Sequence, residues 1–142
     1  MSPMACHFAH LELPGGSGTD IHDVTSQALA AVSQSGVRQG LLTVHAPGST
    51  AAVTTIEHES GVLEDLRQAL ERLAPREGTY AHNARWGDGN GYAHVRAALL
   101  GPSLSVPIED GRPLLGQWQQ IVVLDLDNRP RRRRVVIQVL GE

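Results

Sequence analysis

Short apolar runs separated by turn signals constrain the fold of this chain more than any other feature. In the C-terminal third, Leu104, Val106 and Ile108 alternate with polar or small residues, a period that is typical of strands. Asp110-Gly111 follows as a hairpin-type turn signal. Two longer runs, 117–127 and 132–140, come next and are joined by Asp-Asn-Arg-Pro. All of these runs have the length of strands, and none could span a bilayer.

The first two thirds of the chain mix strand and helix patterns. We expect strands over 6–13, 40–45 and 50–57, the last of them rich in β-branched residues. A helix is expected to start at Thr19 or Asp20 and to stop at Gly36. Leucines at helical spacing predict a second helix over 63–73, and a short third helix is expected over 92–100. This order predicts an α+β fold: one domain over 1–142, with two or three helices on a mostly antiparallel sheet or sandwich.

Composition narrows the function classes. The chain has 142 residues and a formal net charge of −3, which argues against general nucleic-acid binding because that requires a strong positive field. Cys6 is the single cysteine, so an internal disulfide is impossible and a reducing cytoplasm is expected. We see no secretory signal in the first 13 residues and expect no membrane partner.

The segment 80–94 concentrates ligand-type side chains among glycines. His82, Asp88 and His94 are residue types that bind a divalent metal or move protons. Zinc or manganese is favoured over magnesium, which stays possible, because imidazole is a poor magnesium ligand. The alternative is that these side chains hydrogen-bond across the loop and position it.

Glu57 ends an expected strand and is a candidate catalytic residue together with His82 and His94. A buried carboxylate is costly unless it has a partner. It could bind the metal, act as a general base or form an ion pair with an arginine.

Other residues suggest a phosphate site. Ser49 and Thr50 follow a Pro-Gly turn, whose amides and hydroxyls can hold phosphate oxygens. Arg131 and Arg133 are expected on one face of a strand and could bind phosphate by bidentate contacts. The other two arginines of the run would pair with carboxylates such as Asp125 and Asp127, or cross a subunit interface. The loop amides next to the 92–100 helix start would complete the anion site, and the loop residues proposed for it are Asn90 and Gly91.

Several segments, taken together, resemble the YjbQ-like family. They are Pro-Gly-Ser-Thr-Ala-Ala-Val-Thr-Thr-Ile-Glu at 47–57, Tyr-Ala-His at 80–82, Asp-Gly-Asn-Gly at 88–91 with His94, Leu-Leu-Gly-Pro-Ser-Leu at 99–104, Gly-Gln-Trp-Gln-Gln-Ile at 116–121, the arginine run and the closing Gly-Glu. They agree in order and spacing over nearly all of 40–142.

The resemblance implies a compact α+β homotrimer with a site at the subunit boundary. Members carry the name secondary thiamine-phosphate synthase, which implies joining a pyrimidine pyrophosphate to a thiazole phosphate. The chain departs from the family at three positions. Gly48 stands where many members have histidine, and Gly87 and Tyr92 stand where some relatives have histidine. A metal site built from several histidines would therefore have fewer histidine ligands in this chain.

Two functions follow. The first is a thiamine-phosphate synthase-like transferase that acts on a phosphorylated heterocyclic small molecule with a divalent metal. The second is a non-catalytic homotrimer that binds a metal or an anionic metabolite. A catalytic site needs Glu57, His82 and His94 to converge around one open position, whereas a binding module does not.

Overall fold

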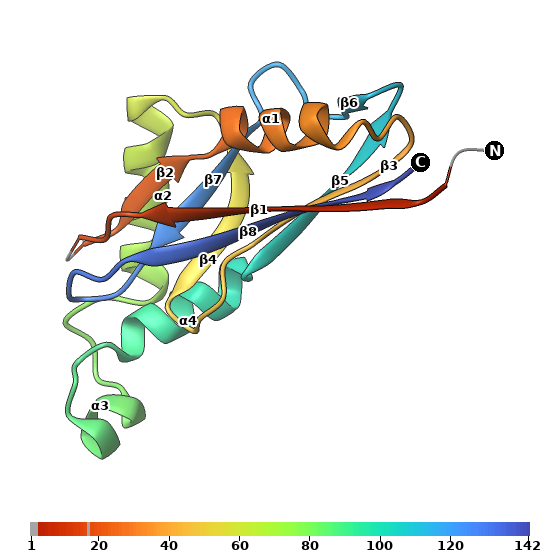
Figure 1. Ribbon diagram of the computed structural model, residues 1–142. Coiled ribbons are helices and arrows are strands. Elements are labelled where there is room, and N and C mark those ends of the chain that lie inside the picture. The colour runs from red at the N-terminus through yellow and green to blue at the C-terminus, as the bar shows by residue number, and fades with distance from the viewer. Residues whose placement is uncertain (1–2, 17) are drawn as a thin grey trace.

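The computed structural model of the chain, which describes residues 3–16 and 18–142, contains two antiparallel sheets and four helices (Figure 1). The strands are β1 (Ala5–Leu13), β2 (Asp20–Asp23), β3 (Gly40–His45), β4 (Ala51–Ile56), β5 (Ser103–Glu109), β6 (Arg112–Pro113), β7 (Gln120–Asp125) and β8 (Arg133–Gly141). The helices are α1 (Thr25–Ser35), α2 (Ser60–Leu73), α3 (Ala81–Trp86) and α4 (Gly91–Leu100). The expected single-domain α+β fold with antiparallel strands is confirmed as a fold class, with one more helix than predicted.

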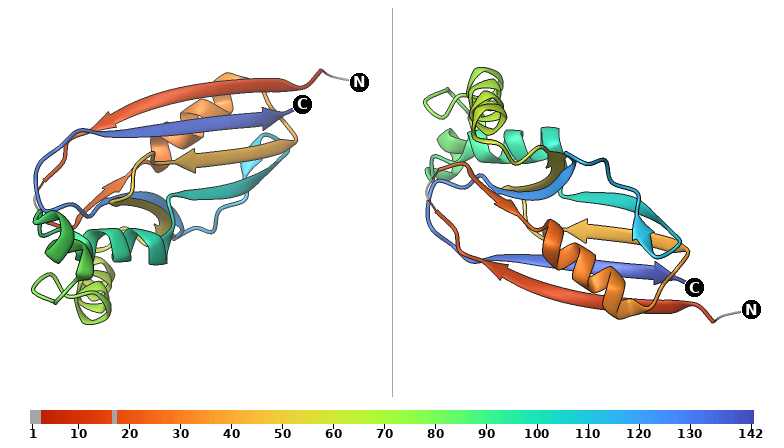
Figure 2. Two further views of the ribbon diagram at one scale, coloured as in Figure 1. Left: turned by 90° about the horizontal axis from the view of Figure 1, so that it is seen from below. Right: turned by 90° about the horizontal axis from the view of Figure 1, so that it is seen from above.

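The larger sheet has the order β1-β8-β3-β5-β6, and the smaller one has the order β2-β7-β4. Helix α1 lies across one face of the larger sheet, while α2 and α4 cover the smaller one (Figures 1 and 2). Strand β7 is therefore buried on both faces. Ile121 and Val123 join the core below α1, and Val122 and Leu124 join a second core with α2 and α4. Full burial of such a side chain contributes about 1.5–3 kcal/mol, so β7 holds the layers together.

Local sequence signals explain most of the element ends. Gly36 adopts a left-handed conformation with φ 72° and ends α1 as predicted. The Glu59 carboxylate accepts hydrogen bonds from the amides of Gly61 and Val62 and begins α2. Asp110 and Gly111 both have positive φ, 51° and 79°, which is the geometry of the expected hairpin turn between β5 and β6.

Two local predictions were wrong. The segment Asp20–Asp23 is strand β2, and α1 begins at Thr25. The N-cap is Val24, without a side-chain cap, and the preceding Asp23 carboxylate accepts hydrogen bonds from the Thr25 amide and hydroxyl. Neither Thr19 nor Asp20 caps the helix. The segment expected to be a glycine-rich loop contains the short helix α3, which ends at Gly87 with φ 72°.

Candidate functional site

Antiparallel pairing brings polar residues of three segments to one end of the smaller sheet. Ala51 pairs with Asp125, so Thr50 lies beside the residues that follow β7. Arg133, the first residue of β8, reaches the same place from the larger sheet. The site therefore lies at the ends of strands β4, β7 and β8, at the junction of the two sheets.

A buried cluster of charged and polar side chains lies at the base of this site. Arg133 is only 4% exposed, and Asp125 and Asp127 are fully buried. The Arg133 Nε donates to Asp125 Oδ1 at 2.9 Å, and its Nη2 donates to the carbonyl and hydroxyl oxygens of Thr50 at 3.1 and 2.6 Å. The Thr50 hydroxyl in turn donates to Asp127 Oδ2 at 3.1 Å. Each of these four side chains has at least one partner, as buried charges require, although Asp125 Oδ2 is buried without a hydrogen-bond partner among the described residues.

The arginine run divides differently from the expectation. Arg131 lies before β8 and pairs with Asp127 at 2.8 Å, while Arg133 pairs with Asp125. The two arginines expected to hold phosphate are thus the ones that meet the two aspartates. Arg132 instead pairs with Glu12 at 3.1 Å in an exposed position.

Asp127 is held ionised by its surroundings. Burial alone would raise its pKa, but hydrogen bonds from the Asn128 amide, Asn90 and Thr50, together with the charge of Arg131, outweigh burial and lower the pKa. The Asp127 side chain is therefore an acceptor toward every neighbour.

Asn90 passes this constraint on to His82. The Asn90 Nδ2 donates to Asp127 Oδ1 at 3.2 Å, and its Oδ1 lies 3.1 Å from His82 Nε2. Because the carboxylate can only accept, the amide nitrogen must face it and the amide oxygen must face the histidine. It follows that His82 carries its hydrogen on Nε2.

The two candidate histidines meet between α3 and α4. Their ring centroids lie 4.4 Å apart with an interplanar angle of 52°. Asp88 Oδ1 lies 3.3 Å from His82 Nε2. The geometry thus brings His82 and His94 together and places Asp88 beside His82, whereas no contact joins Asp88 to His94 among the described residues.

The connecting loop is clamped by two asparagines that the sequence pattern did not reveal. The Asn83 side chain accepts a hydrogen bond from the Gly91 amide at 2.8 Å, and Asn128 Nδ2 donates to the Asp88 carbonyl at 2.8 Å. The Gly91 amide expected to face an anion therefore has a protein partner. Asn128 could only have been read as part of a turn, because its contact lies 40 residues away.

Glu57 and Ser49 lie outside this cluster. Glu57 is exposed and follows the opposite end of β4, about 23 Å along the strand from Thr50 at 3.3 Å per residue. Within one chain it does not meet the histidines. Ser49 is exposed beside Gly48 and lines an opening of about 230 Å³ together with His94.

The arrangement offers an incomplete metal site. Two ligands 2.0 Å from a tetrahedral metal are about 3.3 Å apart, which matches the separation of His82 Nε2 and Asp88 Oδ1. However, the hydrogen on Nε2 faces Asn90, so a metal at this nitrogen would have to displace that hydrogen bond. In the part of the chain that the structure describes, no three His, Cys, Asp or Glu side chains are arranged to hold a metal ion.

Comparison with known proteins gives the family. The model of the UPF0047 protein YjbQ-like family matches residues 9–142. The chain belongs to the YjbQ-like UPF0047 family. A UPF0047 protein of Methanothermobacter thermautotrophicus is 37% identical over 139 residues, which cover 98% of this chain and 95% of that protein. One of Archaeoglobus fulgidus is 39% identical over 130 residues, covering 92% and 98%.

Solved structures show the same YjbQ-like fold. A YbjQ-like protein of unknown function from Sulfolobus solfataricus superposes with a TM-score of 0.94 at 28% identity, covering 99% of this chain and all of the other. A hypothetical protein from Aeropyrum pernix K1 gives a TM-score of 0.87 at 32% identity, with 95% and 98% covered. Among residues 3–16 and 18–142, no helix is long and apolar enough to cross a membrane.

Proposed function

We propose that the site at the start of β4 binds the phosphate of a small phosphorylated molecule, and that the chain is a transferase similar to thiamine-phosphate synthase. One observation carries the proposal. Arg133 Nη1 lies 3.5 Å from where a Cβ on Gly48 would stand, next to the opening lined by Ser49 and His94. Arg133 uses its Nε and Nη2 within the protein, whereas this third nitrogen faces Gly48.

The surrounding groups suit a pyrophosphate leaving group. In the synthase-type reaction, pyrophosphate leaves a pyrimidylmethyl carbon and a thiazole nitrogen attacks that carbon. Such a reaction mainly requires neutralisation of the leaving charge and alignment of the two reactants. Arg133 would supply a fixed positive charge, while the Nε2 hydrogen of His82 stays bound to Asn90 and holds the loop beside the site. Arg131 is partly exposed and could turn from Asp127 to an incoming phosphate.

A divalent metal is a further part of the proposal. Zinc or manganese would use His82, Asp88 and His94, and would supply additional positive charge at the phosphate. Binding through Nε2 would require His82 to give up its hydrogen bond with Asn90, so we expect weak affinity. None of the roles assigned to Arg133 or Arg131 depends on this metal.

The second candidate is a non-catalytic protein that binds an anionic metabolite. The position of Glu57 favours this second function, because the carboxylate expected to act as a general base lies apart from the two histidines. Asp88 is the carboxylate that contacts His82. A site that only binds needs no general base.

Incubation of the purified protein with a pool of phosphorylated metabolites, followed by mass spectrometry, separates the two functions. Time-dependent loss of one compound, absent in His94→Ala and retained in His58→Ala, supports an enzyme. His58 is an exposed histidine outside the site and serves as the matched control. Stoichiometric retention of one anion without turnover would support the binding protein. If neither turnover nor retention is seen, both functions are contradicted.

A further inference from the structure

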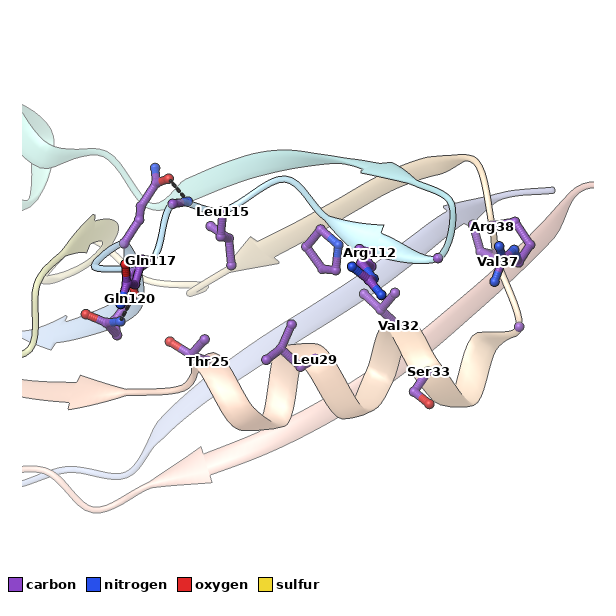
Figure 3. A pocket seen from close by; sticks show the side chains of 15 residues that line it. Thr25, Leu29, Val32, Ser33, Val37, Arg38, Arg112, Leu115, Gln117 and Gln120 are labelled. Carbon is purple, nitrogen blue, oxygen red and sulfur yellow. Dashed lines mark hydrogen bonds between the residues drawn. The ribbon is translucent and has the colours of Figure 1, made fainter.

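A second cavity lies between α1 and the segment 111–120, with none of its lining residues in the candidate site (Figure 3). Its volume is about 570 Å³, which falls within the range of roughly 300–1,000 Å³ typical of small-molecule sites. The cavity runs along most of α1, from Thr25 at one end to Gly36 at the other. At 1.5 Å rise per residue this is a length of about 16 Å, so the cavity suits an elongated ligand.

The middle of the cavity is aliphatic. Leu29 and Val32 project from α1 toward Leu115 on the facing segment (Figure 3). Leu29 is 44% exposed although it lies on the helix face that looks into this space. No aromatic side chain is among the lining residues. An aliphatic chain would bury Leu29, whereas a flat ring would find no stacking partner.

Two arginines give the cavity its charge. Arg38 and Arg112 both line it, and Arg38 Nη1 lies 3.0 Å from where a Cβ on Gly111 would stand. Among residues 3–16 and 18–142, neither arginine forms an ion pair with a carboxylate. The nearby Asp110 accepts a hydrogen bond from Gln39. Glu109 and Asp110 border an adjoining hollow together with both arginines, but among the described residues neither carboxylate forms an ion pair with them. Both guanidinium groups can therefore still bind a ligand.

We propose that this cavity binds an aliphatic carboxylate of medium chain length. The carboxylate would lie between Arg38 and Arg112, because guanidinium groups match its geometry bidentately. The chain would cover Leu29, Val32 and Leu115. A cationic ligand would meet two like charges, and a nucleotide would place its polar groups against an aliphatic surface. This assignment is independent of the phosphate site proposed above.

Calorimetric titration of the full chain with octanoate tests the proposal. We expect saturable one-to-one binding, with a dissociation constant on the order of 1 mM or tighter for a ligand of this size. Acetate has the charge without the chain, and protonated octylamine has the chain with the opposite charge. Both should bind at least about tenfold more weakly, since each lacks one of the two interactions. Equal binding of octylamine, or no binding of octanoate, would overturn the proposal.

Variants place the ligand in the cavity. The double change Arg38→Ala/Arg112→Ala should weaken octanoate binding at least about tenfold, as expected when charge-assisted hydrogen bonds are lost. Both arginines are exposed and form no ion pair with a carboxylate in the described part of the chain, so the variant should fold. Leu29→Glu should abolish binding, because it places a charged carboxylate against the aliphatic chain and adds a negative charge to a cavity that binds an anion.

Matched controls make the same chemical changes on the surface of α2. Arg72→Ala and Leu73→Glu alter exposed residues far from the cavity lining and should leave octanoate affinity unchanged. Amide chemical-shift changes should gather at Leu29 and Leu115. Changes gathered at the exposed Phe8 and Leu41 of the larger sheet would show adhesion to that sheet face and would contradict the assignment.

Discussion

Asn90 and Asp127 are joined by a hydrogen bond of 3.2 Å, although 37 residues separate them in the chain. Through this contact an ionised carboxylate in the sheet junction orients an amide, and the amide orients His82. Both Asn90 and Asp127 are buried, so water does not compete for these bonds. The protonation pattern of the candidate site is therefore set by the core and not by the loop that carries the histidine.

The tautomer of His82 is the first consequence. We expect the wild-type imidazole to hold its hydrogen on Nε2. Asp88 Oδ1 lies 3.3 Å from the same nitrogen and is a second acceptor, so Asn90→Ala combined with Asp88→Ala should release this preference. Long-range proton–nitrogen correlation spectra distinguish the two tautomers of each neutral histidine. The exposed His58 should be unaffected and provides the internal control. A wild-type His82 with its hydrogen on Nδ1 would contradict the relay from Asp127.

Acid stability is the second consequence. The pKa of Asp127 is lowered in the folded protein, so the unfolded state binds more protons between that pKa and the ordinary value of about 3.9. The contribution of Asp127 to stability is thus complete above the unfolded pKa and is lost as pH falls through the folded one. Urea unfolding of the wild type and Asp127→Asn at pH 7 and pH 3 measures it. The stability difference between the two proteins should shrink at pH 3, and a constant difference would argue against an ionised Asp127.

Local sequence patterns predicted the strands and helices that are bounded by turn or capping residues. Strand β3 and the C-terminal end of α1 at Gly36 follow from turn and capping residues, and α4 begins within one residue of its predicted start. Strand β8 has the alternation that buries Arg133 and Val135. Strand β2 was missed because its four residues gain their structure from pairing with β7, a contact with a distant segment. Helix α3 was missed because the density of glycines around it suggested only a loop.

The candidate site was predictable in its residue types and not in its partners. The convergence of His82 and His94 followed from two histidines flanking one loop. The pairing of Arg133 with Asp125 depends on how two sheets meet, which no local period encodes. Glu57 lies apart from the histidines because β4 is extended, so the end of a strand is far from its start.

The ion cluster should dominate the response of this end of the molecule to mutation. Arg133→Met leaves Asp125 buried and without its cation, which costs about 3–5 kcal/mol for a pair of this kind. Arg134→Met changes the exposed neighbour and should remain within about 0.5 kcal/mol of the wild type. Chemical denaturation of both variants makes the comparison. Similar stabilities would show that the buried pair contributes little.

The homotrimer stays a prediction that the exposed face of the larger sheet supports. Phe8, Leu41 and Leu140 are exposed on three adjacent strands of this sheet, and burial between subunits would remove them from water. Light scattering at micromolar concentration should give three times the chain mass of 15.2 kDa. Leu140→Arg should shift the mass toward the monomer, whereas Leu73→Arg on α2 should not. A wild-type mass of one chain would remove the prediction.

Metal binding is the prediction with the clearest geometric condition. Zinc would need His82, Asp88 and His94 together, and in the present arrangement His82 Nε2 faces Asn90. We therefore expect weak zinc binding by calorimetry, and a further loss of at least about tenfold in His94→Ala, since the removal of even an outer partner costs that much. The fold should survive, because His94 is half-buried and outside both hydrophobic cores. Asn90→Ala removes the competing hydrogen bond, so its zinc affinity should rise or stay equal. Unchanged affinity in His94→Ala would instead assign His94 to positioning the loop through its contact with His82.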